Sequence, residues 1–315
     1  MIIVNYNTRD DTVACVGSVL EHAGDLRVHV VVVDNGSVDG SVKALRAIHP
    51  QIEVIEAGTN LGFARAVNVG AGNSTGEFVL LLNPDTLMLP ESLPSLIDFA
   101  RSNRQYHLIG GRTLRDDMTL EPSSCWGEPT LWSLTMYATL LSTAFKRSRL
   151  FDPESLGRWN RDTIREVPII TGCLLLIGRQ DFSQLGGMDE DFFLYGEDAE
   201  FSMRAKARGL TRVVYPRAAI IHSVGGSTSS PGSSKGSMVM AGKVTLLNKT
   251  WSPRRAAAGR ALLHSGVAIR AALETVGRRS DRPWTTVWRR RRDWAPGYPH
   301  AEAAIFGRSI PPAER

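Results

Sequence analysis

The sequence predicts an α/β fold in which a mostly parallel central sheet is flanked by helices. Short apolar runs that suit buried strands alternate with segments of helical spacing over residues 1–100, which is the pattern of parallel strands joined by helices. Several of these runs also end in polar residues. Because open α/β sheets place ligands at the carboxyl ends of their strands, this edge is the expected functional site.

The first three expected elements form a β-α-β unit. Residues 2–4 are apolar and end in Asn5-Tyr6-Asn7, residues 8–22 have helical spacing, and the apolar run 28–33 ends in Asp34-Asn35-Gly36-Ser37. The crossover between two such strands is right-handed. Two neighbouring strands therefore bring polar side chains to the same edge of the sheet.

The alternation continues to the most informative residue, Asp85. Residues 39–48 are expected to be helical, residues 52–56 to be a short strand, and Asn60 to Arg65 to lead into another helix. The apolar run ending at Leu82 then indicates a strand covered on both faces. Asp85 follows it in Asn83-Pro84-Asp85, and a carboxylate there suits Mg²⁺ or Mn²⁺ bridging nucleotide phosphates. The alternative is an ordinary turn in which Asp85 is a cap.

A second acidic group lies around Glu197 and Asp198. The apolar positions that follow them predict a helix from near Glu197 to Gly209. Adjacent residues on a helix point about 100° apart, so only one of the two carboxylates can face a substrate squarely. The alternative is an acidic first turn stabilised by the helix dipole. Upstream, residues 167–177 predict a central strand in which Gly172 allows close approach of a ligand or a neighbour.

Five ordered motifs resemble those of glycosyltransferase family 2, and within it the bacterial rhamnosyltransferases. They are Asn5-Tyr6-Asn7, Asp34 to Ser37 with Asp39, Asn60 to Phe63, Asn83-Pro84-Asp85, and Gly196-Glu197-Asp198. The resemblance covers about residues 1–225 and implies a GT-A fold. It implies a nucleotide-sugar-binding half at 1–110 and an acceptor-binding half with the catalytic base at 111–225. A loop and helix are expected at 226–250, and a basic helical C-terminal extension at 251–315.

The resemblance also implies roles for single residues. Donor binding is expected from nine positions: Asn5, Tyr6, Asn7, Asp34, Asn60, Gly62, Arg65, Asn83 and Asp85. Asp34 has turn capping as its alternative role, and Arg65 a solvated position on a helix. Asp85 matches the last acid of the family's Asp-X-Asp metal motif. Asn83 replaces the first acid, so weaker metal binding is expected.

His222 is the expected second metal ligand. It follows the apolar run 218–221, and in related enzymes a histidine at this place completes the shell of Mg²⁺ or Mn²⁺. Neutral imidazole is compatible with Mn²⁺. The alternative is a hydrogen-bonded structural histidine.

The implied activity is inverting, metal-dependent sugar transfer. Asp198 is expected to act as general base on an acceptor hydroxyl while Glu197 supports the loop. The metal at Asp85 is expected to neutralise charge on the departing diphosphate. The predicted donor is dTDP-rhamnose, and the predicted acceptor is a polyprenyl-diphosphate-linked saccharide in cell-wall or surface polysaccharide synthesis.

The basic charge of the chain belongs to its last part. Residues 251–315 hold 13 Arg and no Lys against 5 acids, a net charge of +8, whereas residues 1–250 carry −3. Trp284, Trp288 and Trp294 flank Arg289 to Arg292, a pattern that suits an anionic membrane surface. No apolar run reaches the roughly 18 residues of a membrane span. Peripheral attachment of the tail is therefore predicted, with a second membrane contact at 131–145. The alternative for the tail is a solvated basic extension, and the alternative for 131–145 is a helix packed on the acceptor-binding half.

Composition sets the outer bounds. The 315 residues, 43% of them hydrophobic, can bury a full core as one large domain or two fused halves. Three cysteines without metal-binding spacing favour a reducing cytoplasm. No secretory signal is expected. The first strand begins so close to Met1 that a start site upstream is possible. Ser and Gly at 226–240 predict a mobile loop, and residues 295–315 show little pattern.

Three other functions are alternatives to sugar transfer. A nucleotidyltransferase would need a glycine-rich loop with Arg and Lys near the first strand, where only Arg9 occurs. A dinucleotide oxidoreductase is excluded because Gly70, Gly72 and Gly76 end a helix and precede a strand. A non-enzymatic nucleic-acid-binding protein could use the Arg-Trp tail, but the acidic motifs argue against it as the main function, and no nucleic-acid partner is predicted.

Overall fold

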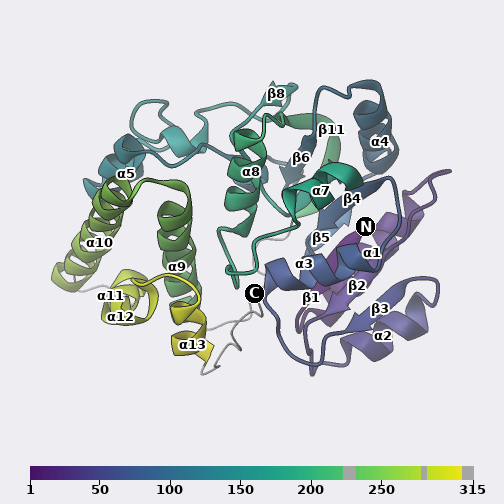
Figure 1. The fold of residues 1–315 in the computed structure, drawn as a ribbon, viewed down its shortest axis with the longest axis horizontal. Helices are drawn as coiled ribbons and strands as arrows, with labels where there is room; N and C mark the ends of the chain where they lie inside the picture. The colour runs from purple at the N-terminus through teal and green to yellow at the C-terminus, as the bar shows by residue number, and fades with distance from the viewer. Residues whose placement is uncertain (223–231, 278–281, 307–315) are drawn as a thin grey trace. The chain divides into compact units, whose positions relative to one another are not determined.

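The computed structural model describes residues 1–222, 232–277 and 282–306 (Figure 1). These residues divide into two compact units. The first comprises Met1–Gly127, Trp159–Asp189 and Phe201–Ser229, and the second comprises Glu128–Arg158, Glu190–Glu200 and Ser230–Arg315. The unit boundary falls inside helix α8 (Glu197–Ala207), after Glu200.

A mixed sheet organises the first unit. Among the described residues nine strands form it, in the order β3-β2-β1-β4-β10-β6-β11-β5 with β8 on β11. The strands are β1 (Ile2–Asn5), β2 (Val31–Asp34), β3 (Glu53–Glu56), β4 (Phe78–Leu82), β5 (Thr86–Met88), β6 (Leu108–Leu114), β8 (Arg165–Glu166), β10 (Leu174–Gly178) and β11 (Arg212–His222). A small second sheet pairs β7 (Cys125–Trp126) with β9 (Ile169–Ile170).

Helices cover both faces of this sheet, as the apolar runs predict. The helices of the unit are α1 (Arg9–Glu21), α2 (Ser41–Ile48), α3 (Phe63–Gly72), α4 (Ser92–Ser102) and α7 (Arg179–Leu185), with the 3₁₀ turn η1 (Pro122–Ser124). Ile3 and Val32 belong to the core that includes residues of α1, α2 and α4. The opposite side chains, Ile2 and Val33, face α3, where a Cβ added at Gly70 would press on both. β1 and β2 are thus buried on both faces.

The predicted fold class is confirmed, with added detail. β3, β2, β1 and β4 are parallel, whereas β10 runs antiparallel to both of its neighbours. The strand predicted at 167–177 is split into β9 and β10 around Thr171-Gly172-Cys173. A Cβ at Gly172 would lie 3.2 Å from the Phe63 ring, so the close approach predicted there is to a neighbouring side chain.

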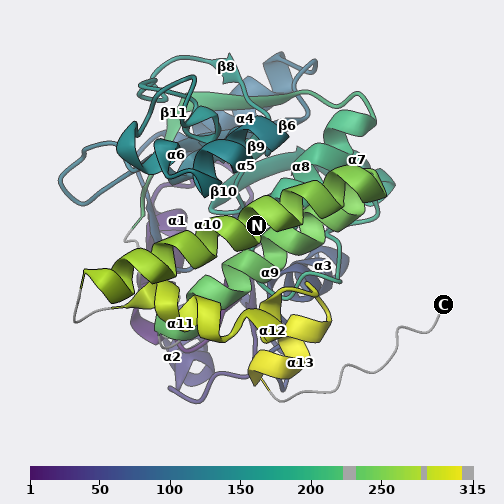
Figure 2. The ribbon, with the colours of Figure 1, turned by 90° about the vertical axis from the view of Figure 1, so that its left-hand side faces the viewer.

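The second unit is helical. Its helices are α5 (Leu131–Ala138), α6 (Leu141–Ala144), α9 (Gly232–Thr250), α10 (Pro253–Val276), α11 (Pro283–Arg289), α12 (Arg291–Trp294) and α13 (His300–Phe306), with the 3₁₀ turn η2 (Pro153–Ser155). Figure 2 shows α9 beside α10, with α11 to α13 gathered near them. Arg270 of α10 donates to the carbonyl of Tyr137 on α5, and Glu274 accepts from the backbone of Trp284 and Thr285 at the start of α11.

Two expectations about this part of the chain are wrong. Residues 232–240, predicted from their Ser and Gly content to belong to a mobile loop, are the first half of α9, because Ser237, Met238 and Met240 are buried in the unit. Residues 226–231 of that predicted loop, and 307–315 of the patternless tail, lie outside the described residues. Trp294 is fully buried and donates to the carbonyl of Val287, so it is a core residue and faces no membrane.

Candidate active site

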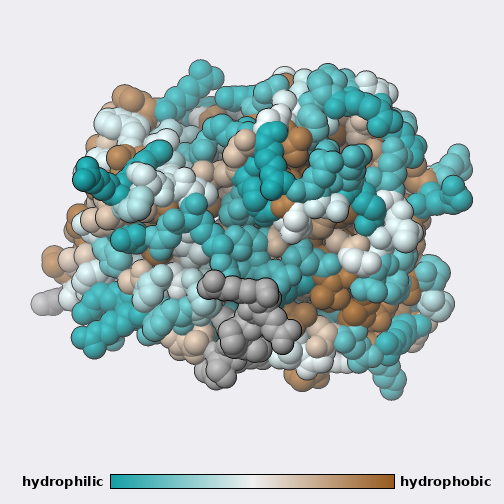
Figure 3. Space-filling view, in the orientation of Figure 1, coloured by the Kyte–Doolittle hydropathy of each residue, from teal (hydrophilic) through white to brown (hydrophobic). Residues whose placement is uncertain are grey.

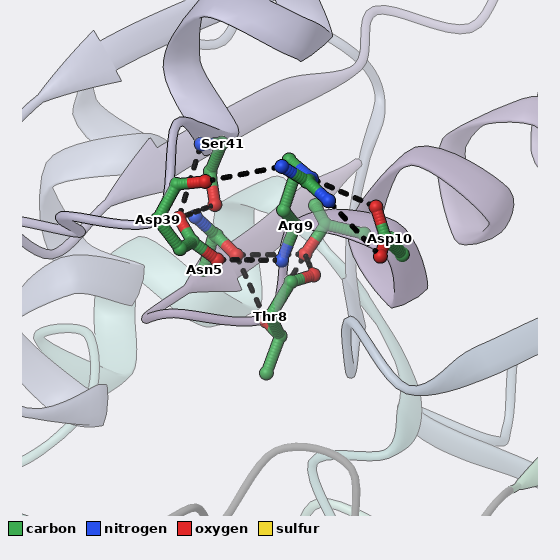
Figure 4. A network of polar contacts seen from close by, with 7 residues as sticks. Asn5, Thr8, Arg9, Asp10, Asp39 and Ser41 are labelled. Carbon is green, nitrogen blue, oxygen red and sulfur yellow. Dashed lines mark hydrogen bonds and ion pairs between the residues drawn. The ribbon is translucent and has the colours of Figure 1, made fainter.

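A buried polar network fixes Asp34 at the end of β2. Asn5, at the end of the adjacent β1, donates from Nδ2 to Asp34 Oδ1 at 2.6 Å and to Ser37 Oγ at 3.0 Å. Its Oδ1 accepts from the hydroxyls of Thr8 and Thr12. Figure 4 shows Asn5 and Thr8 near Asp39, which accepts from the backbone N–H of Arg9. The Asn5 side chain is thus occupied within the protein and positions Asp34.

Asp34 itself combines both roles that its position suggests. Its Oδ2 accepts from the backbone N–H of Ser37 at 2.9 Å, which caps the turn, and the side chain is almost fully buried. An ionised carboxylate has about four lone-pair sites, so acceptor capacity for a ligand is left. Its contact with a donor stays a prediction.

The loops around Asp34 hold the other predicted donor residues. Asn7 has a positive φ of 54°, donates to Ser37 and accepts from Val38, while Tyr6 is exposed. Asn60 accepts from Gly62, and Asn35 donates to the Gly62 carbonyl just before α3. Arg65 is half-buried on α3. Direct donor binding by these residues stays a prediction.

Sheet register brings Asp85 and His222 together. β11 and β5 pair antiparallel with His222 opposite Thr86, which places the imidazole beside Asp85. His222 Nε2 lies 3.5 Å from Asp85 Oδ1, and the two side chains are 12% and 2% exposed. Asn83 is half-buried, and its carbonyl accepts from the Thr86 hydroxyl.

A third acidic side chain, Glu121, lies on the other side of the imidazole. Its Oε2 is 3.7 Å from His222 Nδ1, and the Ser123 hydroxyl is 3.3 Å from the same nitrogen. Burial alone would lower the pKa of His222, but the hydrogen bonds and charges of Asp85 and Glu121 outweigh it and raise this pKa to about 9. A carboxylate therefore lies beside each ring nitrogen of His222, Asp85 at Nε2 and Glu121 at Nδ1.

Glu197 and Asp198 belong to the second unit and begin α8. Glu197 is buried, and this burial, with the charge of Asp198, raises the pKa of Glu197 to about 8. Asp198 is half-buried and accepts from the backbone N–H of Ala199. The structure thus brings Asp85 and His222 together in the first unit and places Glu197 and Asp198 in the second. Their predicted roles in catalysis stay predictions.

The segment that carries these acids is held by residues much later in the chain. Tyr298 donates to the carbonyl of Leu194 at 2.6 Å, and its ring contacts Phe192 edge-on. Gly196 lies against the backbone of Gly242, where a Cβ would overlap the Tyr195 carbonyl. The C-terminal extension is therefore part of the framework around Glu197 and Asp198.

Comparison with known proteins identifies the family to which this chain belongs. The family model for "Glycosyl transferase family 2" matches residues 1–158, half of the chain, and that for "N-terminal domain of galactosyltransferase" matches residues 162–225. The chain belongs to glycosyltransferase family 2. This membership decides among the enzymatic alternatives in favour of a glycosyltransferase over a nucleotidyltransferase.

Two curated relatives of this family 2 glycosyltransferase are themselves named as sugar transferases. It is 30% identical over 228 residues, 66% of this chain and 71% of the relative, to an N-acetylglucosaminyl-diphospho-decaprenol L-rhamnosyltransferase of Mycobacterium tuberculosis. It is 29% identical over 214 residues, 67% of this chain and 62% of the relative, to the low-salt glycan biosynthesis hexosyltransferase Agl10 of Haloferax volcanii. The resemblance to rhamnosyltransferases is confirmed.

Solved structures confirm the GT-A-like fold. The mannosyltransferase PcManGT of Pyrobaculum calidifontis, in complex with GDP-Man and Mn²⁺, has a TM-score of 0.55 at 19% identity, covering 97% of this chain and 84% of that one. GalNAc-T7 with UDP, GalNAc and Mn²⁺ has a TM-score of 0.54 at 17% identity, covering 73% of this chain and 44% of that one.

The residues at the sheet edge fit a divalent ion of the kind these neighbours hold. Asp85 offers a carboxylate oxygen and His222 a ring nitrogen, both donors that Mn²⁺ accepts. Adjacent ligands of an octahedral ion lie about 3 Å apart, close to the 3.5 Å between these atoms. Within the described part of the chain no group of three or more such side chains is arranged to hold a metal. Protein ligation by two side chains suits an ion completed by substrate phosphates and water.

Sequence reasoning missed Glu121, Ser123 and Tyr298. Glu121 stands in no motif, and only the pairing of residues 113 and 121 across a turn brings it to His222. Tyr298 lies about a hundred residues beyond the acids that it supports. For Glu121, the polar residues within 115–124 are a signal for a turn that brings the chain back to the strand edge.

Proposed function

We propose that this chain is an inverting, metal-dependent glycosyltransferase that transfers L-rhamnose from dTDP-rhamnose to a polyprenyl-diphosphate-linked saccharide in cell-wall or surface polysaccharide synthesis. The observation that carries the proposal is the convergence of Asp85 and His222 at the sheet edge of a family 2 glycosyltransferase. The choice of sugar and acceptor is supported by the similarity to the mycobacterial L-rhamnosyltransferase.

The first unit binds the donor in this proposal. Asp34, positioned by Asn5, accepts hydrogen bonds from the pyrimidine or the ribose, and the backbone of residues 5–7 adds to this contact. Asp85 and His222 would hold the divalent ion, Mg²⁺ or Mn²⁺, which would supply Lewis-acid stabilisation of the charge on the diphosphate. Arg65 adds positive charge near the phosphates.

The second unit supplies the base. A sugar hydroxyl is a weak nucleophile, so Asp198 takes its proton as the oxygen attacks the anomeric carbon from the face opposite the diphosphate. The new bond joins acceptor oxygen to anomeric carbon, the bond to the diphosphate oxygen breaks, and the centre inverts. Buried Glu197 supports the turn that carries Asp198.

A donor screen tests this function. Purified protein is offered dTDP-rhamnose, UDP-sugars and GDP-sugars, with and without Mn²⁺, and an N-acetylglucosaminyl-diphospho-lipid as acceptor. We expect metal-dependent transfer from dTDP-rhamnose, with an inverted anomeric centre in the product by NMR. A retained configuration would contradict the mechanism, and turnover of another donor alone would contradict the choice of sugar.

Peripheral attachment to the cytoplasmic face of the membrane is a second part of the proposal. None of the described helices is both long enough and apolar enough to span a bilayer. The second unit exposes the apolar side chains of Trp132, Phe145 and Leu150 close in sequence to Lys146 and Arg149. Figure 3 shows apolar and hydrophilic residues interspersed along the edge where α5 and α10 are drawn in Figure 1. Such a mixture suits an anionic headgroup layer.

Vesicle sedimentation tests this attachment. We expect the protein to sediment with vesicles containing phosphatidylglycerol, and less with pure phosphatidylcholine vesicles. Replacing Trp132 and Phe145 by Ser should release it, whereas the same change at exposed Val38 in the first unit should not. Equal sedimentation with both lipids would contradict an electrostatic contribution, and preferential binding to DNA would favour the nucleic-acid alternative for the tail.

A further inference from the structure

A hydrogen-bonded chain leads away from the imidazole of His222 on the side opposite Asp85. Ser123 Oγ lies 3.3 Å from His222 Nδ1, and the same hydroxyl donates to Glu121 Oε2. The backbone N–H of Ser123 also donates to Glu121 Oε2, at 3.0 Å. Glu121 Oε2 itself lies 3.7 Å from Nδ1, so the nearer partner of this nitrogen is the Ser123 hydroxyl and Glu121 adds its charge.

The direction of these hydrogen bonds fixes the proton on the imidazole. An ionised carboxylate only accepts, so the single hydrogen of the Ser123 hydroxyl points to Glu121. The hydroxyl oxygen can then only accept from His222, which requires a proton on Nδ1. When the ring is neutral, this tautomer leaves the lone pair on Nε2, the nitrogen beside Asp85.

The surrounding backbone makes this arrangement rigid. Glu121 and Thr113 exchange hydrogen bonds across the turn that follows β6, and β6 lies beside β11 in parallel register. The Ser123 carbonyl accepts from the Thr171 hydroxyl at 2.8 Å. Glu121 is therefore held by β6, and Ser123 by the segment between β9 and β10. We call these two residues the relay; Glu121 is 8% exposed.

We propose that Glu121 and Ser123 are positioning residues of the metal site, which hold His222 with its proton on Nδ1 and its Nε2 lone pair directed to the ion beside Asp85. This rests on the proposed function, because it takes Asp85 and His222 as metal ligands. Neither residue touches the ion or the substrate. Outer partners of this kind typically contribute about 10- to 100-fold to metal affinity.

Mn²⁺ affinity in the presence of saturating dTDP, measured from the EPR signal of free Mn²⁺, tests the relay without any turnover. Glu121→Ala releases the Ser123 hydroxyl to donate to Nδ1, so Mn²⁺ should bind about 10- to 100-fold more weakly. Glu121→Gln keeps an acceptor oxygen and should retain affinity within a few-fold. Asp117→Ala, an exposed acid in the same turn, is the matched control and should bind like wild type.

A spectroscopic readout separates this role from a merely structural one. In the diamagnetic Mg²⁺ complex with dTDP, ¹⁵N NMR of labelled histidine should show His222 protonated at Nδ1. In Glu121→Ala the population protonated at Nε2 should grow. If Glu121→Ala does not fold, Ser123→Ala carries the test, because it removes the acceptor for Nδ1–H and should weaken Mn²⁺ binding several-fold.

The outcomes separate this relay from the metal site itself. Wild-type Mn²⁺ affinity and tautomer in folded Glu121→Ala and Ser123→Ala, with affinity lost in His222→Ala, would overturn the role of the relay alone. Unchanged affinity in His222→Ala and Asp85→Ala as well would overturn the proposed metal site, and the relay with it. Weaker Mn²⁺ binding in Glu121→Ala, with affinity retained in Glu121→Gln, would support the role of the relay.

Discussion

The polar site of the first unit and the acidic segment of the second differ in what holds their side chains. Asp34 and His222 are the last residues of paired strands, and Asp85 directly precedes β5, so sheet pairing fixes the backbone at or next to each of them. Glu197 and Asp198 follow a loop, and contacts from Gly242 and Tyr298 restrain it. Donor binding should therefore tolerate changes in the C-terminal extension, whereas transfer should not.

The largest effect is expected at Asp85. Asp85→Ala removes one of the two proposed ligands, and Lewis-acid stabilisation contributes several kcal/mol, so Mn²⁺-dependent dTDP-rhamnose affinity and turnover should each fall by about 10²-fold or more. Calorimetric titration of the donor measures the first quantity. The exposed Asp25→Ala is the control. Full affinity in the Asp85 variant would remove this residue from the donor site.

Gly242→Ala should damage the second unit while leaving the first intact. A Cβ there overlaps the Tyr195 carbonyl, and overpacking of this kind costs about 1 to 3 kcal/mol. We expect a lower melting temperature and slower transfer with unchanged donor affinity. At Gly72 a Cβ meets no described atom within 4 Å, so Gly72→Ala should be neutral or slightly stabilising. Equal losses of melting temperature and transfer rate in Gly242→Ala and Gly72→Ala would contradict the contrast between the units.

Glu197 makes stability depend on pH in a predictable direction. Its folded pKa of about 8 lies above the ordinary value of 4.5, so between these values the folded state holds a proton that the unfolded state has lost. The free energy of unfolding should therefore fall as pH rises through this window, by up to about 1.4 kcal/mol per pH unit from this group. Urea unfolding at several pH values measures it. Glu197→Gln should flatten the slope, and an unchanged slope would show that Glu197 is not buried as a carboxylic acid.

The smallest of these effects is expected at Tyr298. Tyr298→Phe keeps the ring against Phe192 and removes the hydrogen bond to Leu194, which contributes about 1 kcal/mol. We expect kcat for transfer to fall several-fold and donor affinity to stay the same. Tyr106→Phe, which removes a hydroxyl from the first unit, should leave both unchanged. A loss of donor affinity in Tyr298→Phe would contradict the assignment of donor binding to the first unit.

The strand-edge site was largely predictable because its signal is local. Apolar runs followed by Asp34 and Asp85 predict both a strand and the position of its polar end, and these residues lie where the pattern places them. His222 was found in the same way, from the apolar run before it. Its distance to Asp85 follows from the β5–β11 register, which the sequence of either strand alone does not specify.

The parts that escaped prediction depend on contacts between distant residues. Residues 232–240 look like a loop by composition, yet burial of Ser237 and Met238 makes them helical, since tertiary packing outweighs weak local propensity. Trp294 looks like a membrane anchor among arginines, yet it fills the core of the second unit. Glu121 carries no motif because its role comes from the turn that returns it to Thr113.

The most direct test of the proposed general base is Asp198→Asn, studied with saturating dTDP-rhamnose, Mn²⁺ and lipid-linked acceptor in a single-turnover experiment. Removing a general base costs about 10²- to 10⁴-fold. We predict transfer slowed by that factor, with donor affinity within about twofold of wild type. Transfer within tenfold of wild type, or loss of donor binding, would contradict the assignment of the base to the second unit and of the donor to the first.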